Sequence, residues 1–123
     1  MTIGGALQTE DIYARGTELD EIPDPGDGAA IDVSRSGHIQ IVTAAAETNT
    51  LAAPTFVGQR LIISCKTYAV GSRVITVSAA FNAAGNTTIT LDTAGDAICL
   101  EACRGSAGTL KWNEDWTNGP TLG

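Results

Sequence analysis

Residues able to perform catalysis are few and far apart in this sequence. His38 is the single histidine, and Ser36 lies two positions before it in a turn-forming stretch. A serine and a histidine so placed lack the third group that orients the base in a nucleophilic triad. The sequence has no Gly-x-x-x-x-Gly-Lys-Ser/Thr loop, no His-Glu-x-x-His motif and no Gly-x-Ser-x-Gly elbow. These patterns predict no catalytic residues and a protein that is not an enzyme, while a glycosidase-type pair of carboxylates stays open.

Candidate metal ligands and disulfide partners are equally sparse. Asp92 and Asp96 flank one predicted turn, but two carboxylates supply too few oxygens for calcium, which takes about six to eight. Cys99 and Cys103 lie on one predicted strand with Cα atoms about 13 Å apart, beyond the limit of roughly 7 Å for a disulfide. With Cys65 the count is odd, which favours free, buried thiols. We expect neither a metal ion nor a cofactor.

Acidic residues are concentrated in the first quarter of the chain. The formal net charge is −7, and residues 1–33 contain eight of the 14 acids but only one base, Arg15. Such a segment is repelled by nucleic acid and by anionic lipid and is attracted to basic protein surfaces. We therefore expect no nucleic-acid or membrane partner; a charged tail that only aids solubility is the alternative. No signal peptide or apolar span is recognisable, so synthesis in the cytoplasm is expected.

The elements that would position these residues are short β-strands. After residue 28, apolar and polar residues alternate in short runs separated by turn-forming residues. The expected strands are 30–33, 38–43, 47–52, 60–66, 71–79, 87–91, 97–103 and 109–113, with a short turn joining the fourth to the fifth. Ile39 and Ile41 are expected to face inward. Leu61, Ile63 and Cys65 share one face of their expected strand, and Ile89 and Leu91 share one face of theirs. About eight short strands without a helical period predict an all-β protein with a single antiparallel β-sandwich or jelly-roll-like domain over 29–123.

Residues 1–28 differ from the rest and are expected to form an extended N-terminal arm. Residues 9–15 suit a short helix, but so few residues do not hold a helix alone in water. Pro23 and Pro25 keep the following stretch extended. We expect this arm to become ordered on a partner through apolar and acidic side chains. The predicted partner-binding residues are Ile12, Tyr13, Leu19, Asp20, Glu21, Ile22 and Pro23.

Large apolar residues are scarce, with two Phe, two Tyr, two Trp and one Met. A core of small aliphatic side chains is thin, and oligomerisation is a common remedy. Trp112 is expected at the end of the core and Trp116 at an edge. Both are candidate interface residues because aromatic side chains are enriched at interfaces. The composition therefore favours a multimer.

Several strand and turn stretches follow one another in a recognisable order after residue 28. They are Ile31-Asp-Val-Ser-Arg-Ser-Gly-His-Ile-Gln-Ile-Val-Thr43, Glu47-Thr-Asn-Thr-Leu-Ala-Ala-Pro54, Gly58-Gln-Arg-Leu-Ile-Ile63, Thr87-Thr-Ile-Thr-Leu91, Ala94-Gly-Asp96 and Lys111-Trp112. Over about residues 29–116 this order resembles small all-β virion proteins of tailed bacteriophages, in particular capsid decoration (cement) proteins. Related β-modules also occur in phage fibre and spike proteins.

The resemblance implies a homotrimer that sits outside the assembled head at three-fold or quasi-three-fold positions. Its N-terminal arm would reach the capsid surface or a neighbouring subunit. The implied partners are the major capsid protein and further copies of the chain. The implied function is head stabilisation by bridging capsid subunits, and the implied location is the capsid exterior of the virion after synthesis in the host cytoplasm.

Two other functions stay open. The head domain of a phage tail fibre or spike would bind a host receptor or glycan and ignore capsids. Such heads usually sit on a long stalk, whereas this chain has 123 residues. A small-ligand or hydrolytic β-barrel enzyme would need polar residues that converge in a pocket, which strand spacing alone does not show.

Overall fold

The computed structural model describes residues 19–123, which form nine β-strands and no α-helix. The strands are β1 (Asp20–Ile22), β2 (Gly37–Thr43), β3 (Glu47–Leu51), β4 (Arg60–Tyr68), β5 (Arg73–Val77), β6 (Thr88–Leu91), β7 (Ala97–Arg104), β8 (Leu110–Asn118) and β9 (Thr121–Leu122). Seven of the predicted strands correspond to β2 through β8. The predicted strand at 30–33 is reduced to one isolated bridge between Ala30 and Thr50.

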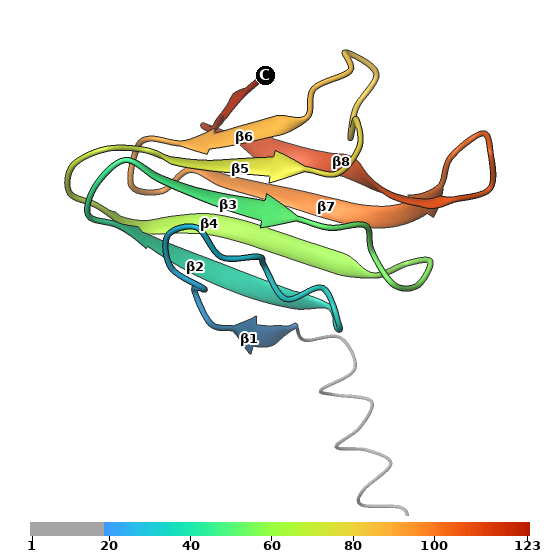
Figure 1. Ribbon diagram of the computed structural model, residues 1–123, viewed down its shortest axis with the longest axis horizontal. Helices are drawn as coiled ribbons and strands as arrows, with labels where there is room; N and C mark the ends of the chain where they lie inside the picture. Colours follow the sequence, from blue (N-terminus) through green and yellow to red (C-terminus); the bar gives the residue numbers. More distant parts are fainter. Residues whose placement is uncertain (1–18) are drawn as a thin grey trace, which may run out of the picture.

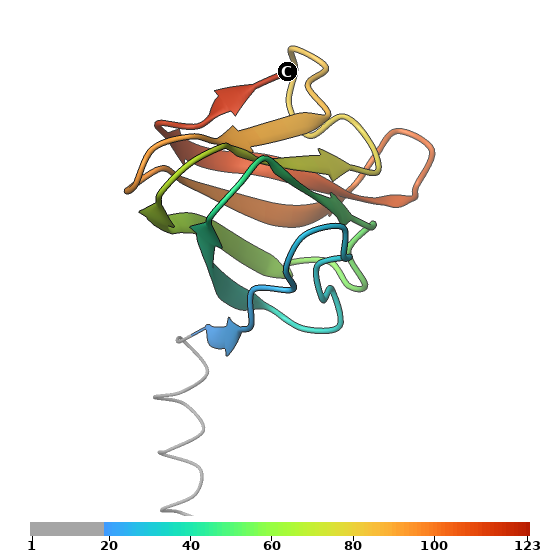
Figure 2. The same cartoon turned by 60° about the vertical axis from the view of Figure 1, so that its left-hand side comes forward.

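The strands form two sheets that stack as layers, as Figures 1 and 2 show. The five-stranded sheet has the order β1-β2-β4-β7-β8, and the four-stranded sheet has the order β3-β5-β6-β9. The predicted all-β, sandwich-like fold is therefore confirmed. None of the described residues belongs to a helix long and apolar enough to cross a membrane.

The sheets are mixed, which corrects the prediction of an antiparallel sandwich. Three pairs are parallel, namely β1 with β2, β2 with β4, and β3 with β5. The remaining pairs are antiparallel. The cause is the route of the chain, because connections 44–46 and 69–72 carry it from one sheet to the other. From β2 to β5 each strand lies in the sheet opposite to its predecessor, so every second strand returns in the same direction.

The two connections, 44–46 and 69–72, stack on each other at one end of the sandwich. The N–H of Glu47 donates to the carbonyl of Ser72 at 3.0 Å. Gly71, with a φ of 77°, approaches the other connection so closely that a Cβ there would lie 2.3 Å from the nitrogen of Ala46. Both the positive φ and this contact require glycine.

The core lies between the sheets and contains Ile39 and Ile41, which were predicted to face inward, together with the same-face sets predicted for two other strands. Ile39, Ile41, Leu61, Ile63, Cys65, Ile89 and Leu91 are all buried. Trp112 is 1% exposed, and its indole N–H donates to the carbonyl of Ala52 at 2.9 Å. The prediction that Trp112 forms part of an interface is wrong, because its burial leaves no surface for a partner.

The sandwich begins before the predicted boundary between residues 28 and 29. In the register of β1 with β2, Ile22 is opposite Ile39, and Ile22 is a core residue with 1% exposure. The N–H of Gly28 donates to Thr48 at 2.7 Å, and that of Ile31 donates to Thr50 at 2.9 Å. Residues 20–28 therefore belong to the sandwich, and residues 1–18 of the predicted arm lie outside the described part of the chain.

Gly71→Ala should destabilise the protein more than the control Gly85→Ala. Both glycines have positive φ, and an alanine in that region costs about 1–2 kcal/mol. A Cβ at Gly85 meets nothing within 4 Å, whereas one at Gly71 strikes the 44–46 backbone. In urea unfolding we expect Gly71→Ala to lose roughly twice as much free energy of unfolding as Gly85→Ala, or more. Equal losses would contradict the stacking of the two connections.

Candidate functional site

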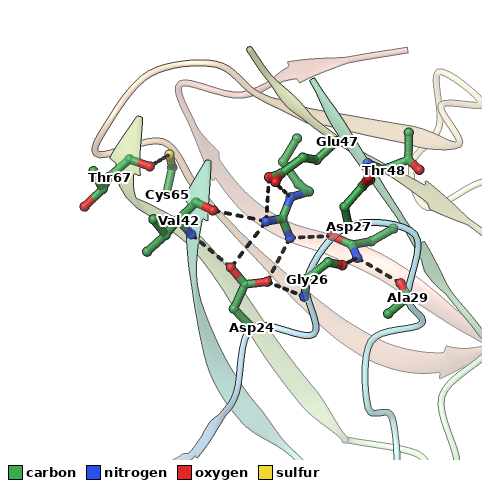
Figure 3. Close-up of polar contacts among 11 residues, drawn as sticks. Asp24, Gly26, Asp27, Ala29, Val42, Glu47, Thr48, Cys65 and Thr67 are labelled. Carbon is green, nitrogen blue, oxygen red and sulfur yellow. Dashed lines mark hydrogen bonds and ion pairs between the residues drawn. The ribbon is translucent and has the colours of Figure 1, made fainter. Parts of the chain in front are cut away.

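Arg73 forms an ion cluster with Asp24 and Glu47 at the end where the two connections stack. Both carboxylate residues are labelled in Figure 3. The Arg73 side chain is 1% exposed. Nη1 is 2.8 Å from Asp24 Oδ1, and Nη2 is 2.8 Å from Glu47 Oε1. Nη1 also donates to Asn49 Oδ1 at 2.7 Å, and Nη2 donates to the carbonyl of Val42 at 3.1 Å. We call Arg73, Asp24, Glu47 and Asn49 the Arg73 clamp, since together they join β2, β3, β5 and the N-terminal segment.

The clamp holds one cation between two carboxylates. Burial acts to lower the pKa of Arg73, but hydrogen bonds and charges from Asp24 and Glu47 outweigh it and raise the pKa. Burial acts to raise the pKa of Asp24. Hydrogen bonds from Arg73 and from two backbone N–H groups, together with the Arg73 charge, outweigh burial and lower that pKa. Loss of Arg73 would leave two carboxylates without their cation, and breaking a buried pair in this way costs about 3–5 kcal/mol, whereas loss of Asp24 leaves Arg73 paired with Glu47.

Further polar contacts fasten the segment between β1 and β2 to the clamp. Asn49 Nδ2 donates to the carbonyls of Gly26 at 2.7 Å and Ala29 at 2.8 Å. Asp27 Oδ1 accepts the N–H of Thr48 at 2.9 Å. Because backbone polar groups next to a core need partners, these bonds let a polar segment lie against the sandwich.

The residues predicted to bind a partner are separated by the structure. Ile12 and Tyr13 lie outside the described residues. Ile22 is buried in the core, so its prediction as an exposed anchor is wrong; its side chain faces the other sheet. The others are half-buried or exposed at the β1 edge of the five-stranded sheet, and they are Leu19, Asp20, Glu21 and Pro23.

A shallow groove of about 250 Å³ lies beside this edge and is lined by Leu19, Glu21, His38 and Gln40. Glu21 is directly opposite His38 in the register of β1 with β2. His38 Nε2 lies 2.9 Å from Ser64 Oγ on the next strand, β4. The groove therefore offers an imidazole, a carboxylate and an amide to a polar ligand.

A serine, a histidine and an acid on neighbouring strands are the residue types of a nucleophilic triad. Ser64, however, lies within β4, which pairs with β2 on one side and with β7 on the other. The backbone N–H groups of such a central strand are used by the two ladders. Within residues 19–123, the two ladders therefore leave no backbone donor of β4 beside the Ser64 hydroxyl to stabilise an oxyanion.

A second outward-facing cluster on the same sheet surrounds Cys99. Arg60 Nη2 is 3.2 Å from Cys99 Sγ and 3.0 Å from Asp115 Oδ2. Contacts with Cys99, and then the charges of Asp115 and Glu101, raise the pKa of Arg60. Trp116 is opposite Cys99 in β8 and is 41% exposed. Trp116 therefore remains a candidate interface residue, unlike Trp112.

No group of three His, Cys, Asp or Glu side chains within residues 19–123 is placed to hold a metal ion. The three cysteines are free. Burial, aided by the charge of Asp96, raises the pKa of the Cys65 thiol and makes it a weak nucleophile. Asp96 accepts the N–H groups of Asp92 and Thr93, both at 3.1 Å, so this side chain holds its turn together.

The Arg73 clamp is the feature that the sequence did not predict. Arg73 and Asp24 are 49 residues apart, and Glu47 meets Arg73 only through the parallel register of β3 with β5. The one local signal was an arginine at the start of an alternating apolar run. That position is also common for exposed arginines, so it did not indicate burial.

No protein-family model matches this chain, and no curated protein sequence is significantly similar to it. The resemblance to capsid decoration proteins therefore rests on the residue pattern alone. The clamp, the charge distribution and the exposed sheet faces are the features from which a function is inferred.

Asp24→Asn should weaken the fold at neutral pH and reduce its sensitivity to acid. Because the pKa of Asp24 is lowered by folding, its stabilising contribution is complete above the ordinary Asp value of about 3.9. The contribution is lost as the pH falls through the lower folded value. In urea titrations we expect the difference in unfolding free energy between wild type and Asp24→Asn to shrink from about pH 5 to about pH 2.

Glu101→Gln is the control for this experiment, because it removes an exposed carboxylate outside the clamp. A difference for Asp24→Asn that stays constant over the whole pH range would contradict the role given to this carboxylate.

Proposed function

We propose that the protein is a structural component of a bacteriophage virion and has no enzymatic activity. In this proposal it is a homotrimeric capsid decoration, or cement, protein that binds the outside of the assembled head. It stabilises the head by bridging neighbouring major capsid protein subunits. The resemblance in residue pattern supports the proposal. The structural observation on which it mainly rests is the Arg73 clamp.

The clamp supports this function because it anchors the start of the described chain. The chain enters the sandwich at the edge strand β1, where Ile22 is buried. Any load on residues 1–18 passes to the ladder between β1 and β2 and to the Asp24–Arg73 pair at 2.8 Å. A protein that cross-links capsid subunits through an N-terminal arm needs such an anchor, since a cross-link is only as strong as its attachment.

The stabilising effect follows from linkage. A ligand that binds the assembled head but not separated subunits stabilises the head by about 2.7 kcal/mol per site at a hundredfold excess over Kd. No covalent step is needed. The exposed acids Asp20 and Glu21 favour a basic capsid surface over nucleic acid or an anionic membrane, and the sequence of residues 1–18 adds further acids. In this proposal the protein lies on the capsid exterior after its synthesis in the host cytoplasm.

Two truncations separate binding by the arm from folding of the sandwich. Removal of residues 1–18 leaves every described strand intact, so we expect a folded protein that no longer sediments with purified heads of its phage. Removal of residues 1–25 also deletes Ile22 and Asp24, and we expect a large loss of stability in addition. Circular dichroism measures folding, and co-sedimentation measures occupancy.

Full occupancy of heads by the protein without residues 1–18 would refute the role of the arm. Absence of binding by the full chain would refute the decoration function itself.

A tail-fibre or spike head domain that binds a host receptor or glycan is the second candidate. The groove lined by Glu21, His38 and Gln40 favours it, because these side chains can form hydrogen bonds with sugar hydroxyls. Full-length protein that binds host cells while leaving phage heads undecorated would support this candidate over the first.

A further inference from the structure

The outer face of the four-stranded sheet carries an ordered array of threonine side chains. The strand register places them in two rows across the sheet. The first row is Thr48, Val74, Thr90 and Thr121, and the second row is Thr50, Thr76 and Thr88. We call these seven residues the threonine face. Neighbouring Cβ atoms in a row of this kind are about 4.5–5.5 Å apart, so the array is dense.

The threonine face has no charged member, and all seven residues are half-buried or exposed. The outer face of the five-stranded sheet is different, because it carries Glu21, Arg60 and Glu101. Depletion of charge, more than overall hydrophobicity, distinguishes the centre of a protein interface from ordinary surface. The four-stranded sheet therefore has the composition of an interface centre.

The hydroxyl groups of this face are available to a partner. None of the six makes a hydrogen bond within residues 19–123. By contrast, the hydroxyls of Thr55, Thr93 and Thr117 are bonded to neighbouring groups. A threonine hydroxyl offers one donor and two acceptor sites, and its methyl group offers apolar contact. The face can thus form both kinds of contact with a similar surface.

We propose that the threonine face is the surface through which copies of this chain contact one another. This inference rests on the proposed homotrimer. Each copy has a net charge of −7, so copies repel one another, and a contact surface without charged side chains adds no further repulsion between facing groups. A second copy presents the same uncharged face, whereas a basic capsid surface gains no electrostatic attraction from it.

Uncharged exposed residues also lie on the connections that lead into this sheet, while exposed Asp27 accepts the N–H of Thr48 at its border. Connections 44–46 and 69–72 lead directly into β3 and β5. Ala44, Ala45 and Val70 are exposed there, Val70 by 68%. This extension matters because a stable interface usually buries about 800 Å² on each partner, more than seven small side chains provide.

Thr76→Glu tests the proposal in the full-length protein. A carboxylate in the middle of the face must either lose its water or hold the copies apart, so we expect the dissociation constant of the oligomer to rise at least about tenfold. The matched control is Thr109→Glu, the same substitution at an exposed loop position beyond β7. Light scattering over a concentration series measures the mass of each variant, and circular dichroism confirms folding. If Thr76→Glu folds poorly, Thr121→Glu places the charge on the short edge strand β9 instead.

The salt dependence of the dissociation constant is a second measurement, and a change that only weakened the fold would not produce it. Because the copies repel one another and the contact has no ion pairs, the wild-type oligomer should become tighter from about 0.02 M to about 0.5 M NaCl. A wild-type protein with the mass of one chain at all concentrations would overturn the proposal. So would a folded Thr76→Glu protein of unchanged mass, an equal loss in Thr109→Glu, or an oligomer that weakens with salt.

Failure of this proposal is distinguishable from failure of the proposed function. If Thr76→Glu dissociates the oligomer but the wild-type oligomer does not sediment with phage heads, the threonine face is supported and decoration is refuted. If the wild-type oligomer decorates heads and Thr76→Glu leaves it intact, decoration is supported and the threonine face is refuted.

Discussion

A single buried cation, Arg73, holds the start of the described chain against the sandwich. The segment that it secures runs between two buried isoleucines, Ile22 and Ile31, but is polar in between. Asp24 contacts the guanidinium from this segment, and Glu47 contacts it from β3. Without the clamp, the polar segment would keep its backbone bonds to β3 and the bond between Asp27 and the N–H of Thr48. The ion cluster therefore determines whether residues 20–28 behave as part of the domain or as an extension of the arm.

The sequence predicted the local features of this fold and missed those that depend on distant contacts. The alternation in Leu61 and Ile63 shows which residues share a face, and for Ile39 and Ile41 it predicted the inward face, because the period of two is local. The change of sheet at 44–46 has no such signal, so the parallel pairing was not foreseen. Trp112 and Trp116 are four residues apart and would share a face in a regular strand. The irregular register of β8 beside Cys99 instead leaves Trp112 inside and Trp116 outside.

The candidate surfaces divide the molecule by charge. The β1 edge and the outer face of the five-stranded sheet contain acids, a histidine and an arginine, which suit polar or basic partners. The threonine face is free of charge and suits a contact with another negatively charged copy. In the proposed decoration protein, the first surface and residues 1–18 would face the capsid, while the second would face neighbouring copies. One short chain would then supply both contacts without sharing residues between them.

Amide hydrogen exchange of wild type and Arg73→Lys tests the central role of the clamp most directly. Lysine keeps the positive charge but loses the planar fork that binds Asp24 and Glu47 together. The N–H groups of Gly28 and Ile31 report on the N-terminal segment, because both donate to carbonyls of β3. We predict that Arg73→Lys speeds exchange at these two positions while the N–H groups of β4 keep their protection. Unchanged exchange at Gly28 and Ile31, or an equal loss of protection throughout β4, would contradict this role of Arg73.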